Sequence, residues 1–158
     1  MKSLKYGMNT HIIPGFAPLD IVANDFNTTH VKVTNALSCA FLLGFGVITG
    51  DSINITVEES TAAATTSAEA IGFGFRLSGD TATDTWGDVT TCDSLGTTIT
   101  ASDDNKFLWI EVDLREMSED CNYLSVLGTT ESSMSACVVS AVCFLESRYG
   151  QYDPDSTT

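Results

Sequence analysis

The fold is decided by one stretch of the chain, KFLWIEVDLREM at positions 106–117. From Leu108 onward, large apolar residues alternate with other types, so that Leu108, Ile110 and Val112 fall on one side of an extended backbone. Trp109 and the charged residues that follow it fall on the other side. A period of two is typical of a strand with one face in a core. The stretch therefore predicts a β-strand whose second face meets water or a partner.

The same alternation recurs in residues 53–58 and 71–77, and turn residues separate these segments. Residues 38–48 and 136–146 are almost continuously apolar, which indicates strands that are central or buried on both faces. About eight strands can be counted in this way. We expect an all-β fold, an antiparallel two-sheet sandwich of jelly-roll-like type with an extended N-terminal arm.

Two glycines interrupt one of the predicted strands. Gly72 and Gly74 leave one face of the segment 70–78 almost without side chains. Glycine inside a strand marks a bend or the close approach of another backbone. The pattern predicts one of these two features and does not choose between them.

Composition restricts the function. A chain of 158 residues is long enough to form a single domain with its own core. The net charge of −14, with only seven basic residues, argues against nucleic acid as a partner. The longest apolar run, residues 36–48, contains Gly44 and Gly46 and is shorter than the roughly 20 residues that a membrane helix needs. In a secretory signal an apolar segment follows the basic residues, but no such segment follows Lys2 and Lys5, so we expect no secretory signal.

The first 30 residues differ from the rest. They contain Pro14 and Pro18 and scattered large apolar residues with no regular period, which predicts an extended arm over residues 1–30. Through residue 32 the chain carries three basic and two acidic residues, whereas the remainder carries four and 19. We expect a β-sandwich domain over 31–150 and a loose tail over 151–158. The arm either docks onto another chain or packs along its own domain.

Five cysteines show neither a C-x-x-C pair nor a nearby histidine. This spacing fits neither a disulfide framework nor a zinc site. Cys137 and Cys143 lie in an apolar segment, where cysteine behaves as a small apolar residue. We therefore expect buried free thiols and assembly in a reducing cytoplasm.

Catalytic patterns are weak. The two histidines, His11 and His30, lie in the predicted arm, and the chain has no phosphate-binding or zinc-protease motif. The pairs Glu111 with Asp113 and Glu58 with Glu59 are the candidates for acid–base chemistry. However, 21 acidic residues produce such neighbours by chance, so a solvated acidic surface is the expectation. We predict no enzyme activity and no cofactor.

Loop oxygens and tryptophans offer alternatives. Oxygen ligands for a cation are offered by Asp80 with Asp84 and by residues 103–105, but the spacing of an EF-hand is absent. We therefore expect no metal, and a structural cation is the alternative. Trp86 lies in a polar loop and Trp109 on the non-core face of the deciding strand. Each indicates either packing or a contact for a partner.

The late part of the chain resembles a known family. The block at 107–117, the segment YLSVLG at 123–128 and the closing apolar segment ACVVSAVCFLESRY at 136–149 are similar to those of small head proteins of tailed bacteriophages. This resemblance implies a capsid decoration or cement protein of the virion, made in the host cytoplasm. It also implies binding to the major capsid protein as a homo-oligomer, with no membrane partner and no catalysis.

Two functions follow for testing. Under the first, the contacts with major capsid protein or a neighbouring copy come from five residues of the arm, which are Tyr6, Met8, Ile12, Ile13 and Phe16. Under the second, the chain is a carbohydrate- or ligand-binding β-sandwich module. Its site would then be the loop Asp80–Asp88 with Trp86.

Overall fold

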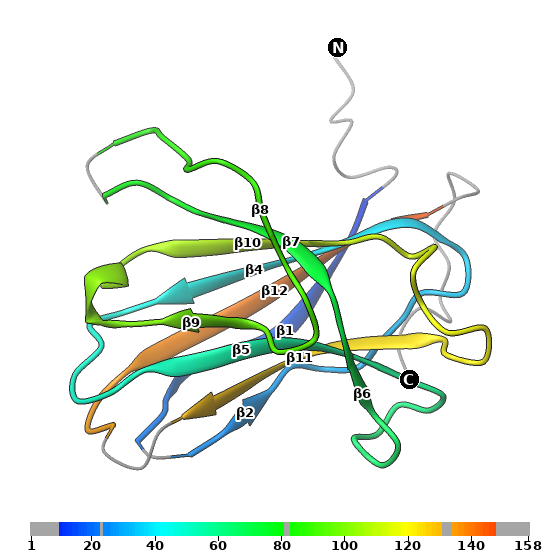
Figure 1. Ribbon diagram of the computed structural model, residues 1–158, viewed down its shortest axis with the longest axis horizontal. Coiled ribbons are helices and arrows are strands. Elements are labelled where there is room, and N and C mark those ends of the chain that lie inside the picture. Colours follow the sequence, from blue (N-terminus) through cyan, green and yellow to red (C-terminus); the bar gives the residue numbers. More distant parts are fainter. Residues whose placement is uncertain (1–9, 23, 81–82, 131–133, 148–158) are drawn as a thin grey trace.

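The computed structural model describes residues 10–22, 24–80, 83–130 and 134–147. These residues form two antiparallel β-sheets packed face to face, which confirms the predicted two-sheet sandwich (Figure 1). The described residues contain one short 3-10 turn, Ala101–Asp103, and no α-helix. No helix in this part of the chain is long and apolar enough to cross a membrane.

Each of the two sheets contains six strands. In sheet A all six form one hydrogen-bonded order, and in sheet B two short strands pair with members of a four-stranded order. Sheet A has the order β1-β12-β4-β10-β7-β8. Its strands are β1 Thr10–Asp20, β12 Val138–Ser147, β4 Ala36–Phe45, β10 Phe107–Val112, β7 Phe73–Leu77 and β8 Thr90–Cys92. Sheet B has the order β2-β11-β5-β6, with β3 paired to β11 and β9 paired to β5. Its strands are β2 Phe26–Asn27, β11 Tyr123–Thr130, β5 Ile53–Ser60, β6 Glu69–Ile71, β3 Val31–Lys32 and β9 Thr97–Ile99.

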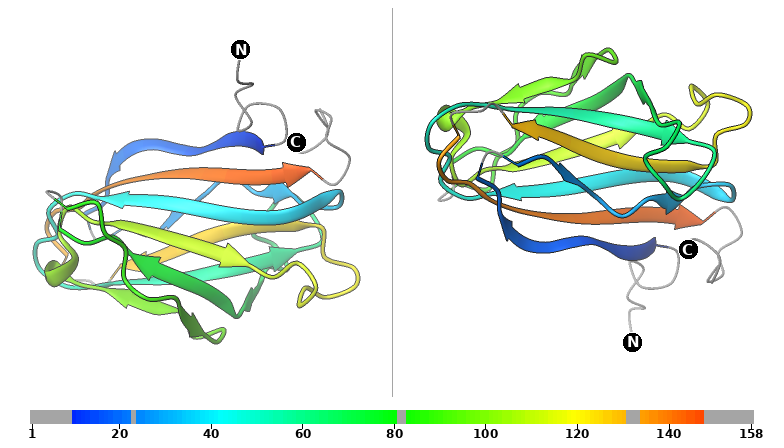
Figure 2. Two further views of the ribbon diagram at one scale, coloured as in Figure 1. Left: turned by 90° about the horizontal axis from the view of Figure 1, so that it is seen from above. Right: turned by 90° about the horizontal axis from the view of Figure 1, so that it is seen from below.

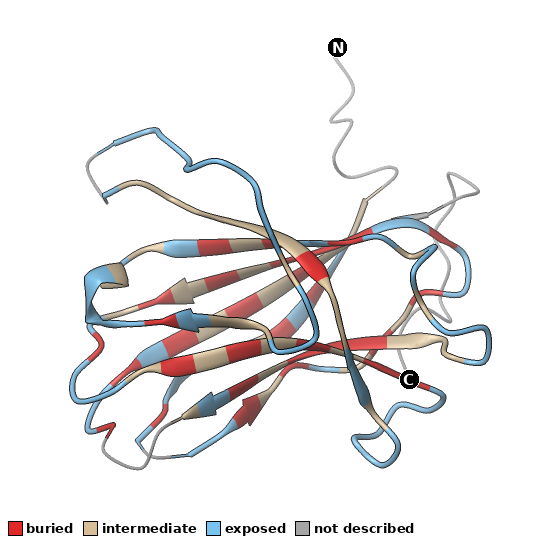
Figure 3. Cartoon of the chain, viewed as in Figure 1, coloured by how far each residue is buried: buried red, intermediate tan, exposed pale blue. Residues whose placement is uncertain are grey.

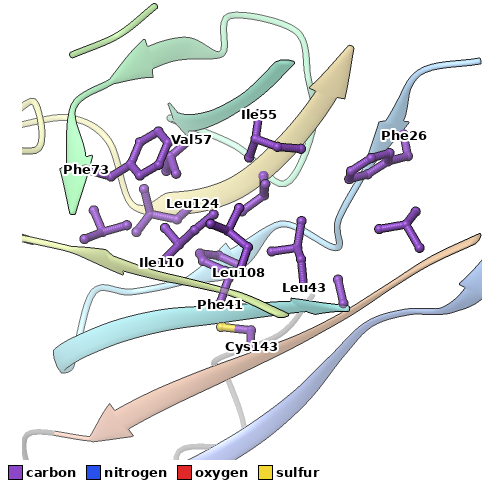
Figure 4. Close-up of a cluster of buried hydrophobic side chains, with 14 of the residues drawn as sticks. Phe26, Phe41, Leu43, Ile55, Val57, Phe73, Leu108, Ile110, Leu124 and Cys143 are labelled. Carbon is purple, nitrogen blue, oxygen red and sulfur yellow. The ribbon is translucent and has the colours of Figure 1, made fainter. Parts of the chain in front are cut away.

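The core lies between the inward faces of the two sheets. Leu108 and Ile110 of β10 are fully buried, as their alternation predicts, and Ile55 and Val57 of β5 are buried opposite them. Figure 4 shows these side chains converging between the layers together with Phe41. Figure 3 shows buried residues alternating with more exposed ones along the long strands. In β5 and β10 the period of two therefore assigns the correct face of the strand to the core.

The expected arm is, over its described part, an edge strand of its own domain. β1 pairs antiparallel with β12, and Figure 2 shows it at the margin of sheet A. Ile13 and Ile21 are buried, with exposed fractions of 3% and 1%. Two register shifts, on either side of Phe16, each add one residue to β1 and break the period of two. The sequence therefore looks irregular although the segment is a strand.

The boundary predicted at residue 30 does not separate two bodies in the described residues. β2 and β3 belong to sheet B, and β1 belongs to sheet A, so residues 10–32 contribute to both layers. Of the two interpretations of the arm, packing along its own domain holds for its described part. Residues 1–9 and the predicted tail 151–158 lie outside the described residues.

The segment 70–78 is divided between the sheets. β6 pairs with β5 in sheet B, whereas β7 pairs with β10 in sheet A, and Gly72 lies between them. A Cβ atom at Gly72 would lie 3.0 Å from the carbonyl oxygen of Cys92. Both features that the glycine pattern allows, a bend and a close backbone approach, therefore occur at this position.

The deciding strand is shorter than the sequence predicts. β10 ends at Val112, and residues 113–117 form a turn. A carboxylate oxygen of Asp113 accepts hydrogen bonds from the backbone N–H and from Nε of Arg115, at 3.0 and 2.9 Å. An aspartate side chain that binds the backbone two residues on favours a turn over a strand. This local bond ends β10 although the alternation continues to Leu114.

Candidate interaction surface

The outward face of sheet A carries apolar side chains in register. Paired residues in adjacent strands form one row across four of its strands, and this row runs Trp109, Leu42, Val142, Pro14. The next row runs Glu111, Ala40, Phe144, Ile12. All of these positions alternate with buried residues such as Leu108 and Cys143. Their side chains therefore point away from sheet B.

We call this surface the apolar face. It is defined by seven residues: Ile12, Leu42, Phe107, Trp109, Val138, Val142 and Phe144. The exposed fractions of Ile12, Phe107 and Val138 are 55%, 48% and 46%, and the others are half-buried by their neighbours. Within the described part of the chain, the face is thus open to solvent. A contiguous apolar patch of this kind marks an interaction site.

Trp109 is the centre of the apolar face. Its ring lies 5.5 Å from that of Phe144, centroid to centroid. Its indole Nε1–H donates a hydrogen bond of 2.6 Å to a carboxylate oxygen of Glu111. The polar atom of Trp109 is therefore satisfied within its own strand. Of the alternatives for Trp109, burial against the second sheet is wrong, because the residue is half-buried on the outward face.

The alternative site, the loop Asp80–Asp88, folds back against β7. The N–H of Gly87 donates to the carbonyl oxygen of Leu77, and Ser78 forms an isolated bridge with Trp86. The guanidinium of Arg76 lies 5.3 Å from the centroid of the Trp86 ring, within range of a cation–π contact. Trp86 retains an exposed fraction of 42%. Residues 81 and 82 of this loop lie outside the described residues.

The candidate acid–base pairs have separate partners. Asp113 forms a two-point ion pair with Arg115, and these hydrogen bonds lower the pKa of Asp113 to about 2. Glu59 is buried and accepts bonds from the backbone N–H and the hydroxyl of Ser118, at 2.9 and 2.5 Å. Glu58 is its neighbour in the strand and points to the opposite face. Neither nominated pair therefore forms a two-carboxylate site of the kind that glycoside cleavage uses.

The oxygen ligands of residues 103–105 take part in a turn. Asp104 accepts a hydrogen bond of 2.7 Å from the N–H of Ile48, and Asp103 accepts one of 3.1 Å from the N–H of Thr100. The ammonium of Lys106 lies 3.4 Å from Asp103. Among the residues that the structure describes, no group of three or more His, Cys, Asp or Glu side chains could hold a metal ion.

All five cysteines are free thiols. Cys39, Cys137 and Cys143 are buried, as expected, whereas Cys92 and Cys121 are half-buried. The sulfurs of Cys39 and Cys143 are 3.7 Å apart, and this hydrogen bond together with burial raises the pKa of Cys39. Burial raises the pKa of Cys137 to about 11. Thiols with raised pKa values are poor nucleophiles and packing explains their presence.

The predicted contact residues of the arm fall in different places. Ile12 is exposed on the apolar face, whereas Ile13 is in the core. Phe16 is half-buried and lies edge-to-face with Phe26, at 5.3 Å between centroids. Tyr6 and Met8 lie outside the described residues. Among the described residues of the predicted set, Ile12 is therefore the one that is largely open to a partner.

Five residues of the apolar face were not predicted as contacts: Leu42, Phe107, Val138, Val142 and Phe144. For all of them except Phe107 the signal is present in the sequence, because residues 38–48 and 136–146 are apolar at both alternating sets of positions. That pattern indicates strands that are buried on both faces. In the structure, sheet B covers the inward face of these strands, and the outward face forms the apolar face.

Comparisons of the chain with protein-family models, with curated proteins and with solved structures give no match. The observations that bear on function are therefore the fold, the apolar face and the distribution of charge.

Proposed function

We propose that the protein is a non-enzymatic structural protein of a tailed-phage virion, which decorates or cements the capsid shell. The observation that carries this proposal is the apolar face on a sandwich that already has a complete core of its own. A protein that leaves such a face open is suited to assembly with another protein surface. The resemblance of residues 107–149 to small phage head proteins gives the setting of that assembly.

The chemistry of the polar groups supports a role in binding. The carboxylates of Glu59, Asp103 and Asp104 bind backbone groups of the same chain. They hold turns in place, and such a use leaves them without a free proton-transfer partner. The surface outside the apolar face is strongly acidic, which keeps a protein with an open apolar patch soluble.

The role of the predicted arm changes in this proposal. Ile12 extends the apolar face at the edge strand, so β1 contributes to the same surface as Trp109 and Phe144. Ile13 and Phe16 instead hold β1 on the domain. Tyr6 and Met8 remain candidate contacts with the major capsid protein.

Co-sedimentation with capsid shells tests the proposal. The shells are assembled from the major capsid protein encoded in the same phage genome, and bound protein is measured as its concentration rises. We expect saturable binding that weakens when Ile12 and Phe107 are both replaced by Ser. Leu95→Ser is the matched control, because Leu95 is 78% exposed in a loop away from the apolar face. Wild-type protein that stays in the supernatant would overturn the proposal.

The second candidate, a carbohydrate-binding module, is favoured by one observation. Trp86 presents a partly exposed ring that Arg76 supports through a cation–π contact. Aromatic rings of this kind bind flat apolar ligand faces. Glycan-array binding that disappears in Trp86→Ala and survives in Leu95→Ser would favour this function over capsid decoration.

A further inference from the structure

We infer that the apolar face is covered by the same face of a second copy of the chain, giving a dimer in which two copies of sheet A stack. The inference rests on the proposed function for its setting. It assigns the apolar face to the contact between two copies, so that the pair of copies, and not a single chain, would bind the shell. It follows from the shape, the size and the charge of the face.

The shape of the face is flat. A Cβ atom at Gly44 would lie 3.0 Å from a ring carbon of Phe107, so the Phe107 ring lies down over the β4 backbone. Trp109 and Phe144 belong to strands on either side of β4, and their rings meet above it at 5.5 Å. The small residues Gly44 and Ala40 make room for this arrangement. Two flat sheet faces can stack about 10 Å apart, as sheets do inside a sandwich.

The size of the face matches half of a stable interface. The four strands that carry the face, β1, β12, β4 and β10, span roughly 19 Å at about 4.8 Å per strand, and the longest of them extend roughly 33 Å. The product is on the order of 600 Å², which is at the lower end of the roughly 600–1,000 Å² that one partner buries in a standard protein–protein interface.

The charge of the face suits an identical surface. Its central positions, which include Leu42, Val142 and Phe144, are uncharged, and the nearest carboxylates already accept bonds from their own chain. Glu111 accepts from Trp109, and Glu146 accepts from the hydroxyl of Ser38. A basic partner would find few free carboxylates here. A second copy would bring the same uncharged centre, and like charges would meet only where Glu111 and Glu146 lie beside it.

Sedimentation velocity tests the inference with the full chain alone, at about 0.15 M salt so that net repulsion is screened. We expect wild type to sediment with twice the chain mass of 16.9 kDa. The double variant Ile12→Ser with Phe107→Ser should sediment as a monomer. Because each substitution acts twice in a two-fold interface, its dissociation constant should rise about 100-fold or more. Leu95→Ser should remain a dimer.

Fluorescence locates the contact. In Trp86→Phe, Trp109 is the remaining tryptophan, and we expect its emission to shift to shorter wavelength as the concentration is raised through the dimer transition. A wild-type monomer at all concentrations overturns the inference. A dimer that survives in the double variant Ile12→Ser with Phe107→Ser overturns it as well. Dimerisation that appears only after deletion of residues 1–9 also overturns it, because that result would mean that the chain's own N-terminal residues cover the face. A monomer that binds capsid shells would reject the dimer alone, and a dimer that fails to bind them would reject the capsid role alone.

Discussion

The proposed dimer should become stronger as salt is added, whereas a complex held by opposite charges becomes weaker. Each copy carries a net charge of −14, so two copies repel one another, and lowering the salt concentration removes the screening of that repulsion. We therefore expect the dimer to form at about 0.15 M salt and to dissociate at about 0.01 M, where the Debye length grows from about 8 to about 30 Å. A complex held by opposite charges would behave in the reverse way.

The size of the effect follows from the layer spacing. Four stacked sheets about 10 Å apart place the centres of the two domains about 20 Å apart. Treated as two point charges of −14 in water, the copies repel by roughly 3 kcal/mol at 0.15 M salt and by roughly 20 kcal/mol at 0.01 M. The difference far exceeds the roughly 4 kcal/mol that separates micromolar from nanomolar affinity.

Sedimentation equilibrium over a series of NaCl concentrations measures this dependence. Leu95→Ser serves as the control, since it keeps the net charge and the apolar face. A dissociation constant that is unchanged or smaller at low salt would refute the reasoning. A smaller constant would mean that the copies meet through opposite charges and not through the uncharged centre of sheet A, and an unchanged one would mean that the net charge does not oppose association.

Three further expectations concern the folded chain. Ile110→Ala should lower the free energy of unfolding by about 2–5 kcal/mol in urea titration, because Ile110 is fully buried. Ser118→Ala should cost about 1–3 kcal/mol by the same measurement, because the buried Glu59 carboxylate loses a hydroxyl donor. The pKa of Cys137 is about 11 in the folded state, above the ordinary thiol pKa of 9.0. Its contribution to the free energy of unfolding is therefore fully present below pH 9 and is lost as the pH rises from 9 to 11. Urea midpoints across this range should fall, and less steeply in Cys137→Ala.

Each of these expectations has an outcome that contradicts it. A loss below about 1 kcal/mol in Ile110→Ala would mean that β10 is not central to the core. An unchanged midpoint in Ser118→Ala would show that water replaces the hydroxyl at Glu59. Equal alkaline slopes in wild type and Cys137→Ala would assign the pH dependence to other groups, such as Cys39, whose pKa is also raised.

The sequence is a good guide to this fold wherever the pleat is regular. Strands β5 and β10 keep the period of two, and their inward apolar residues are buried as predicted. In β7, Phe73 is buried, and Phe75 and Leu77 are partly buried against the core. β1 is different, because its two inserted residues change which side chains face inward. The sequence of such a strand shows no regular alternation, and only its pairing with β12 identifies it as a strand.

The candidate site is less accessible to sequence reasoning. Apolar positions on both faces of β4 and β12 are visible in the sequence, but they do not tell whether sheet B, a loop or another chain covers the second face. The register supplies the missing information, because it places Trp109, Leu42 and Val142 in one row. The sequence also cannot foresee that Asp113 ends β10 through its bond to Arg115.

The construction of β1 also limits how copies of this protein can associate. Pro14 and Pro18 have no N–H to donate, and the two bulges interrupt the spacing of the remaining groups along the strand. A strand from another molecule would therefore find no continuous ladder at this margin, and edge-to-edge pairing through β1 is disfavoured. The proposed stacking through the flat side of sheet A would use up that face in two molecules, so the assembly would close at two copies even in a crowded solution.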